Sequence, residues 1–114
     1  MESVVHSHDV RNRTLVLGIP GDLLSTNVEA VRARAFSLLE DPALSHTALE
    51  TVEIDLRHAR MVDSMGLNLL VSIIRMAKKL GSSVRVLVAS NSVMRTCQFT
   101  RLHLHAEIRR VAAE

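Results

Sequence analysis

The sequence has neither tryptophan nor tyrosine and only two phenylalanines. Proteins that bind single-stranded nucleic acid usually stack the bases on aromatic side chains along a basic groove. This chain lacks the aromatic residues, and its net charge is only +2, with acidic and basic residues interspersed. The composition therefore argues against direct binding of nucleic acid. Because 47% of the residues are hydrophobic, the core has to be built mainly from Leu, Val, Ile, Ala and Met.

The sequence also lacks the features of exported and membrane-spanning proteins. Cys97 is the only cysteine, so no internal disulfide can form. The chain has no N-terminal apolar segment of the signal-peptide kind and no apolar run long enough to span a membrane. We therefore expect a cytoplasmic protein without membrane contact. The length of 114 residues predicts a single domain over residues 1–114.

Signatures of catalysis and of metal binding are incomplete. Ser64 lies in Asp-Ser-Met-Gly, which lacks the first glycine of a nucleophile elbow, and no motif places a histidine as its base. His6 and His8, like His103 and His105, have the spacing of a metal-binding pair on an extended segment. No Cys or carboxylate cluster completes either pair. The sequence thus predicts no catalytic residue, no metal and no cofactor.

Hydrophobic periodicity predicts strands that alternate with helices. In order, we expect a β-hairpin from residues 3–8 and 14–19, a helix over 27–40, a strand over 51–56, a helix over 64–80, a strand over 84–89, a short helix through about 99 and a last strand over 106–111. A polar connection over 43–50 precedes the 51–56 strand. This alternation predicts an α/β fold with a mixed sheet.

Local signals predict where several elements begin and end. Thr26 is the expected N-cap of the first helix, because Glu29 three residues later completes a capping box. Pro42 ends that helix, and Gly81 ends the second one. The continuous apolar character of residues 84–89 suits a buried parallel strand.

The stretch from Asp55 to Leu70 joins the end of a predicted strand to the start of the most apolar helix. Asp63-Ser64 stands at that helix start. The first N–H groups of a helix have no intrahelical partner and carry partial positive charge, so a hydroxyl or a phosphate is favoured there. On the residues alone, Ser64 is an ordinary first-turn serine and Asp63 a helix cap.

A helical projection at about 100 degrees per residue gives the second helix one narrow polar face. The polar face contains Ser64, Asn68, Ser72, Arg75 and Lys79, and the opposite face contains Gly66, Leu69, Leu70, Ile73, Ile74, Ala77 and Leu80. Val71 falls within the polar face, and Met65 lies at its margin. We expect both to face a partner, since exposed apolar residues beside a polar site suit an interface. The alternative is a wide apolar stripe that packs between the sheet and a neighbouring helix.

The same stretch resembles a known signature. It contains Asp-Leu, then five residues of any type, a hydrophobic residue and Asp-Ser-x-Gly-Leu-x-x-Leu. The residues of this pattern are Asp55, Leu56, Val62, Asp63, Ser64, Gly66, Leu67 and Leu70. It resembles the signature of anti-sigma factor antagonists, which are single STAS domains. The resemblance extends to residues 21–23 upstream and 84–88 downstream. It implies a STAS-like mixed β-sheet with an N-terminal β-hairpin and helices packed mainly on one face.

The resemblance implies a regulatory protein without catalysis. In this family the unmodified form binds an anti-sigma factor and frees a sigma factor. The anti-sigma factor is often a serine kinase with a histidine-kinase-like ATPase fold, which phosphorylates the motif serine, and a serine phosphatase resets the switch. Carried over to this sequence, the phosphorylated residue is Ser64, and its modification releases the partner.

The expected partner surface combines the helix start with the loop after the hairpin. Met65 stands where many relatives have a second serine, which leaves Ser64 as the acceptor. Leu24 stands where an Asp often follows the Gly-x-Leu pattern, so Asp22, Ser25 and Thr26 are the candidates for polar contacts there, although turn and cap roles explain them equally well. The full set is Asp22, Ser25, Asp63, Ser64, Met65, Gly66, Asn68, Val71 and Ser72.

Two other functions fit part of these observations. A structural STAS subunit of a transport or stress-signalling assembly would use the same surface without a phosphorylation cycle. Hydrolysis at Ser64 would need the base and oxyanion site that the sequence does not provide.

Overall fold

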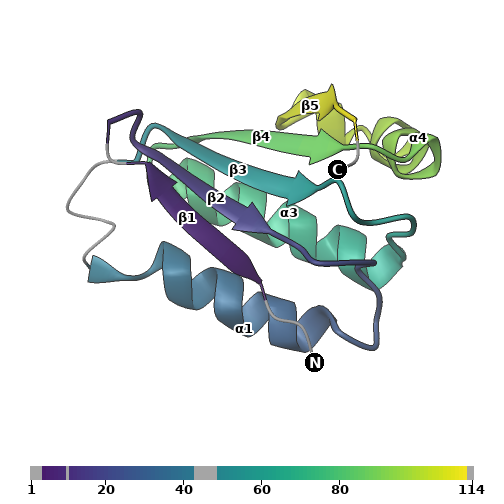
Figure 1. The fold of residues 1–114 in the computed structure, drawn as a ribbon, viewed down its shortest axis with the longest axis horizontal. Coiled ribbons are helices and arrows are strands. Elements are labelled where there is room, and N and C mark those ends of the chain that lie inside the picture. The colour runs from purple at the N-terminus through teal and green to yellow at the C-terminus, as the bar shows by residue number, and fades with distance from the viewer. Residues whose placement is uncertain (1–3, 10, 43–48, 113–114) are drawn as a thin grey trace.

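The computed structural model describes residues 4–9, 11–42 and 49–112 (Figure 1). Its elements are β1 (Val5–Asp9), β2 (Thr14–Gly18), α1 (Val28–Leu39), β3 (Thr51–Leu56), α3 (Ser64–Lys79), β4 (Ser83–Val88), α4 (Asn91–Phe99), the 3-10 helix η1 (Leu102–Leu104) and β5 (Glu107–Arg110). The strands form one sheet in the order β1-β2-β3-β4-β5. β1 runs antiparallel to β2, and the remaining neighbours are parallel. The predicted α/β fold, mixed sheet and N-terminal hairpin are confirmed.

Helices α1 and α3 lie side by side on one face of the sheet (Figure 1). The parallel strands are added in one direction, from β2 to β5. Because such crossovers are right-handed, successive helices fall on the same face. Helix α4 lies at one end of the molecule, where it contacts β4 and β5. The prediction that the helices pack mainly on one face is confirmed.

The core lies between the sheet and its helices. In β4, Val84, Val86 and Val88 are buried, whereas Arg85 and Leu87 are half-buried. The continuous apolar run thus belongs to a parallel strand that is fully buried on one face only. On the other face, Arg85 Nε lies 3.0 Å from a carboxylate oxygen of Glu53 on β3.

The N-terminus of α1 differs from the prediction. Its N-cap residue is Asn27, and no side chain caps the helix. Asn27 instead closes the preceding turn, since its Oδ1 accepts from the Leu24 N–H at 2.9 Å and its Nδ2 donates to the Asp22 carbonyl at 2.8 Å. Thr26 is exposed. The predicted capping box is wrong because α1 begins at Val28, so Thr26 lies one position before the N-cap residue.

The C-terminus of α3 ends as predicted at Gly81, whose φ of +87° suits glycine. Leu80, placed on the apolar face by the projection, is 46% exposed. This placement was wrong because Leu80 is the C-cap residue and no longer follows the helical projection. No helix within the described ranges is long and apolar enough to cross a membrane.

The cysteine and the histidine pairs noted in the sequence have the following surroundings. Cys97 is buried in α4, and this burial raises the pKa of its thiol. His103 lies in η1, so it does not share an extended segment with His105, and both are exposed. The side chains of His6 and His8, the start of the first predicted strand and most of the 43–50 connection lie outside the described residues.

The end of β3 is fixed by a buried carboxylate. Asp55 is buried, and its two carboxylate oxygens accept from Arg57 Nε at 3.0 Å and Arg57 Nη2 at 2.8 Å. The Arg57 backbone N–H also donates to Asp55 Oδ1 at 3.0 Å. Burial by itself raises the pKa of Asp55, but the side-chain and backbone hydrogen bonds from Arg57 outweigh it, so the pKa is lowered. The pair sets the direction in which the chain leaves the sheet towards α3.

Asp55→Asn should lower the free energy of unfolding at pH 7 by about 1–2 kcal/mol, because charge-assisted hydrogen bonds are lost at a buried site. Because the pKa of Asp55 is lowered on folding, the ionised carboxylate stabilises the fold at pH values above its ordinary pKa of 3.8. This stabilisation is lost as the pH falls through the pKa of the folded state. Urea unfolding at pH 7 and pH 3 tests this expectation. The difference in the free energy of unfolding between wild type and variant should be smaller at pH 3 than at pH 7. An equal difference at both pH values would contradict the expectation.

Candidate functional site

Two loops at one edge of the sheet build the candidate site. The first follows β2 and the second follows β3, and these neighbouring strands are parallel, so both loops leave the sheet at the same edge. Leu23 and Val62 form an isolated parallel bridge between the loops. The Leu23 N–H donates to the Met61 carbonyl at 3.1 Å, and the Asp63 N–H donates to the Leu23 carbonyl at 3.2 Å. The loops are therefore joined through their backbones.

An aspartate from each loop binds the backbone of the other. Asp22 Oδ1 accepts from the N–H groups of Arg60 at 2.7 Å and Met61 at 3.1 Å. In the opposite direction, Asp63 Oδ2 accepts from the Ser25 N–H at 2.8 Å. The Asp22 carboxylate thus joins the two loops and neither caps a helix nor closes a turn within its own loop, and its contact with a partner stays a prediction. Together these bonds make the two loops one structural unit.

Asp63 also caps α3, as predicted. Its backbone is extended, with φ −86° and ψ −177°, and its Oδ1 accepts from the Gly66 N–H at 2.9 Å. The bonds from Gly66 and, next in size, Ser25 lower the pKa of Asp63. The carboxylate is therefore ionised at neutral pH, beside the positive end of the helix dipole.

Gly66 lets the first turn of α3 approach the first loop. A Cβ at this position would lie 2.3 Å from the Leu23 carbonyl oxygen and 3.0 Å from the Leu23 Cγ. A backbone oxygen held in the Leu23–Val62 bridge cannot move away without breaking the joined loops. The glycine of the motif is thus required by packing.

Gly66→Ala should destabilise the protein by about 1–3 kcal/mol, the usual cost of overpacking a rigid contact. Gly21→Ala is the matched control, since a Cβ there would meet nothing within 4 Å. Urea unfolding of both variants checks the expectation. Equal midpoints for wild type and Gly66→Ala would show that the first turn of α3 adjusts freely.

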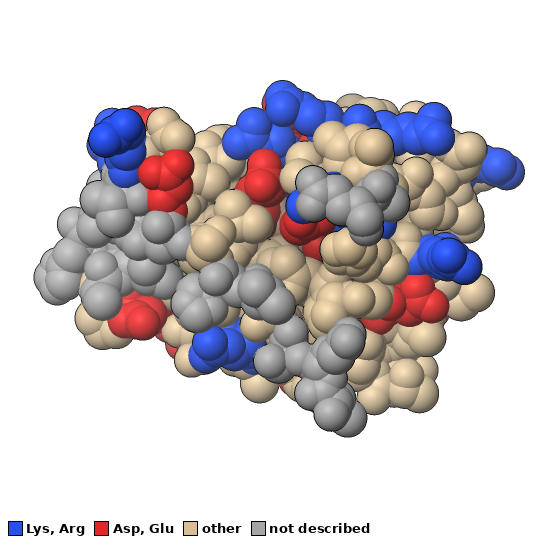
Figure 2. Space-filling model, viewed as in Figure 1, with Lys and Arg blue, Asp and Glu red and all other residues tan. Residues whose placement is uncertain are grey.

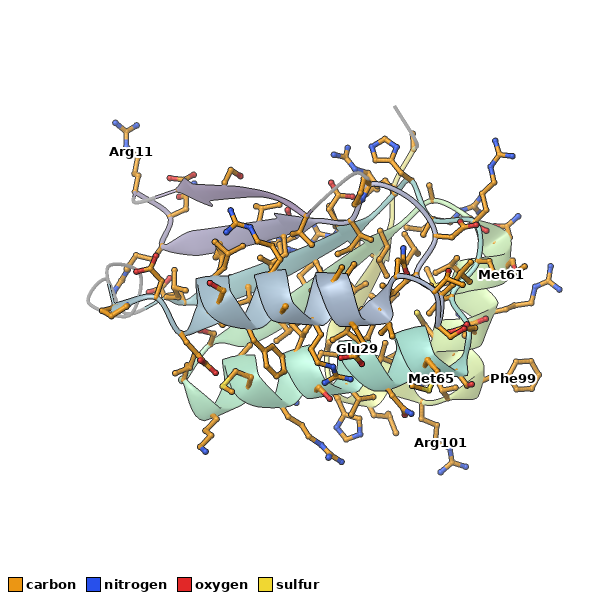
Figure 3. All side chains as sticks on the ribbon, turned by 90° about the horizontal axis from the view of Figure 1, so that it is seen from below. Arg11, Glu29, Met61, Met65, Phe99 and Arg101 are labelled. Carbon is orange, nitrogen blue, oxygen red and sulfur yellow. The ribbon has the colours of Figure 1, made fainter. Side chains whose placement is uncertain are left out.

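Ser64 is the first residue of α3 and is exposed. Among the described residues, none hydrogen-bonds to its hydroxyl. Asn68 is exposed one turn later, and Ser72 is half-buried, with its hydroxyl donating to the Asn68 carbonyl at 3.0 Å. Met65, beside Ser64, is 43% exposed (Figure 3). The geometry leaves the Ser64 hydroxyl accessible on a helix start whose backbone is held by Asp63.

The structure does not bring every predicted site residue to the surface around Ser64. Gly66 is buried, and Val71 is half-buried and packs against the core. Ser25 is exposed and contributes its backbone N–H to Asp63. Val71 therefore packs against the core, as the alternative of a wide apolar stripe predicted, and its contact with a partner stays a prediction.

Sequence reasoning missed two exposed apolar residues at this end of the molecule. Met61 is 57% exposed in the second loop, and Phe99 is 86% exposed at the end of α4 (Figure 3). A signal for Phe99 was available, because Val93 and Cys97 define the buried stripe of that helix. A residue two positions after Cys97 points well away from this stripe.

The fold agrees with a comparison to known protein families. The family model described as the STAS domain matches residues 6–114. The chain belongs to the STAS domain family. The STAS-like architecture expected from the motif around Asp63 and Ser64 is thus confirmed. A comparison with curated protein sequences finds no match.

Solved structures of other proteins share this STAS fold. An anti-sigma factor antagonist from Mycobacterium paratuberculosis aligns with a TM-score of 0.76 at 14% identity, covering 93% of this chain and 83% of that one. An anti-sigma-factor antagonist (STAS) domain protein from Planctomyces limnophilus aligns with a TM-score of 0.76 at 18% identity, covering 100% of this chain and 92% of that one. The unphosphorylated form of the anti-sigma factor antagonist SpoIIAA aligns with a TM-score of 0.64 at 18% identity, covering 97% of this chain and 89% of that one. At these identities the likeness establishes the fold.

Proposed function

We propose that this STAS domain is an anti-sigma factor antagonist that changes partners when Ser64 is phosphorylated. The observation that carries the proposal is the exposed Ser64 hydroxyl in the first turn of α3, next to a capping aspartate within the family motif. Structural neighbours described as anti-sigma factor antagonists support the same role. The proposal includes residues 1–114 acting as one cytoplasmic unit that regulates transcription through protein contacts and has no catalytic activity of its own.

Phosphorylation at this position should leave the fold intact. A phosphoserine carries about −1.5 to −2 charges near neutral pH. Free N–H groups and the helix dipole favour an anion at a helix N-terminus. Ser64 is exposed, so its phosphate displaces no packed side chain. The modification therefore changes the surface that a partner meets, while the core under α3 stays as it is.

The partner is the component that responds to the phosphate. Asp63 is already ionised beside Ser64, because backbone hydrogen bonds lower its pKa. A second anionic group brings repulsion and a large desolvation cost when a protein surface closes over it. The bound partner, in this proposal an anti-sigma factor that is also a serine kinase with a histidine-kinase-like ATPase fold, is then released. A serine phosphatase restores the binding form.

Incubation with the cognate kinase and ATP should place one phosphate on Ser64, detected by phosphopeptide mass spectrometry. Ser64→Ala should remain unlabelled and still retain the kinase in a pulldown. Ser64→Asp should lose the kinase, because its carboxylate reproduces part of the phosphate charge. Ser7→Ala is the control, since Ser7 is exposed on β1 and lies outside the predicted partner surface, so this variant should be labelled and should bind like wild type.

Two results would contradict the proposal. The first is labelling of Ser64→Ala to the wild-type level, which would place the phosphate elsewhere. The second is equal kinase binding by wild type, Ser64→Ala and Ser64→Asp, which would favour a structural STAS subunit without a phosphorylation cycle.

A further inference from the structure

Three exposed apolar side chains lie at the end of the molecule where α3 begins. Met61 is 57% exposed, Met65 43% and Phe99 86%, and Figure 3 shows all three at that end. They come from the loop before α3, from the first turn of α3 and from the last residue of α4. In the part of the chain that the structure describes, the other exposed large apolar residues are Leu80 and Leu104. Three of these five exposed apolar residues thus lie at the end of the molecule where α3 begins.

Phe99 has no visible role in holding the fold together. Helix α4 is anchored by Val93 and Cys97, each 1% exposed, while Phe99 stands in solvent. It is also one of only two aromatic residues in the sequence. An aromatic ring is a large apolar surface with few rotatable bonds, so it contributes strongly when a partner buries it and loses little entropy. Aromatic side chains are accordingly enriched among the residues that dominate binding energy.

Basic side chains accompany these apolar residues. Arg60 lies in the second loop, Arg95 on α4 and Arg101 just after α4, and all three are exposed. Within the described residues none of them forms an ion pair. The carboxylates of Asp22 and Asp63 are occupied by backbone N–H groups of the joined loops. Figure 2 shows Lys and Arg side chains at the end of the molecule where α4 lies. A partner surface that complements these side chains would be apolar and bordered by carboxylates.

We propose that the partner surface of this STAS domain extends from the start of α3 to the end of α4, with Phe99 as its main apolar anchor. Met61 and Met65 flank the anchor, and the three arginines contact carboxylates of the partner. The occupant is the anti-sigma factor, so this inference rests on the proposed function. It also adds to the switch mechanism: a phosphate on Ser64 has the same sign as the partner's carboxylates and opposes the attraction that the arginines provide.

Phe99→Ala should weaken binding to the cognate anti-sigma factor kinase at least about tenfold, the effect expected on truncating a central aromatic anchor. Leu80→Ala is the control, because Leu80 is an exposed apolar residue at the opposite end of α3, outside the proposed surface, and should change the Kd less than about twofold. Isothermal titration calorimetry with the full-length chain and the kinase measures both. The melting temperatures of the two variants should match that of wild type, since neither side chain is buried.

Arg101→Glu tests the electrostatic part. The exchange should weaken binding more at low salt than at high salt, because the contact with carboxylates is screened by ions. An affinity that does not depend on this substitution at either salt concentration would overturn the assignment of an acidic border to the partner.

The outcomes separate this inference from the function on which it rests. Wild-type affinity in Phe99→Ala, together with lost binding in Ser64→Asp, would overturn the anchor and leave the phosphorylation switch standing. Absence of any binding between the wild-type chain and the kinase would overturn both. Concentration-dependent self-association that Phe99→Ala abolishes, with kinase binding unchanged, would show that a second copy covers Phe99 and would also overturn the inference.

Discussion

The carboxylate of Asp63 is the group on which the candidate site depends. One oxygen accepts from Gly66 in α3 and the other from Ser25 in the preceding loop, at 2.9 and 2.8 Å. A single side chain therefore fixes the helix start relative to a loop 38 residues away. Because the same bonds lower the pKa of Asp63, the carboxylate stays ionised and keeps both donors at neutral pH. Asp22 repeats the arrangement in the opposite direction by binding Arg60 and Met61.

Close packing reinforces these hydrogen bonds. Gly66 brings the first turn of α3 against the Leu23 carbonyl, and that carbonyl accepts from the Asp63 N–H. Helix start, first loop and second loop are thus held by contacts that share the same few atoms. Ser64 is exposed on this base, and none of the residues that the structure describes binds its hydroxyl. In the proposed switch, a phosphate on Ser64 acts through surface charge and requires no rearrangement of the STAS fold beneath it.

Much of the fold follows from the sequence, because strands and helices leave a periodicity of two or of 3.6 residues. The hairpin, the helices α1, α3 and α4 and the ends at Gly81 and Asp63 were predictable from such local signals. The loop contacts were not. Asn27 and Thr26 are both good capping residues, and no periodicity indicates that Asn27 closes the turn through bonds to Leu24 and Asp22, three and five residues before it.

The candidate site shows the same division. The motif pointed to Ser64 and to Asp63, which caps α3. The bonds by which Asp22 and Asp63 join the two loops connect residues 38 and 39 positions apart, and no local sequence pattern predicts them. The exposure of Phe99 depends on what covers α4, and its one local signal is its position off the Val93–Cys97 stripe. The most direct test of the account is amide hydrogen exchange, followed by NMR, in Asp63→Ala. Loss of protection at both the Ser25 and Gly66 amides, with protection kept in β3 and β4, is the predicted result. Unchanged protection at Ser25 would contradict the claim that Asp63 joins the two loops into one site.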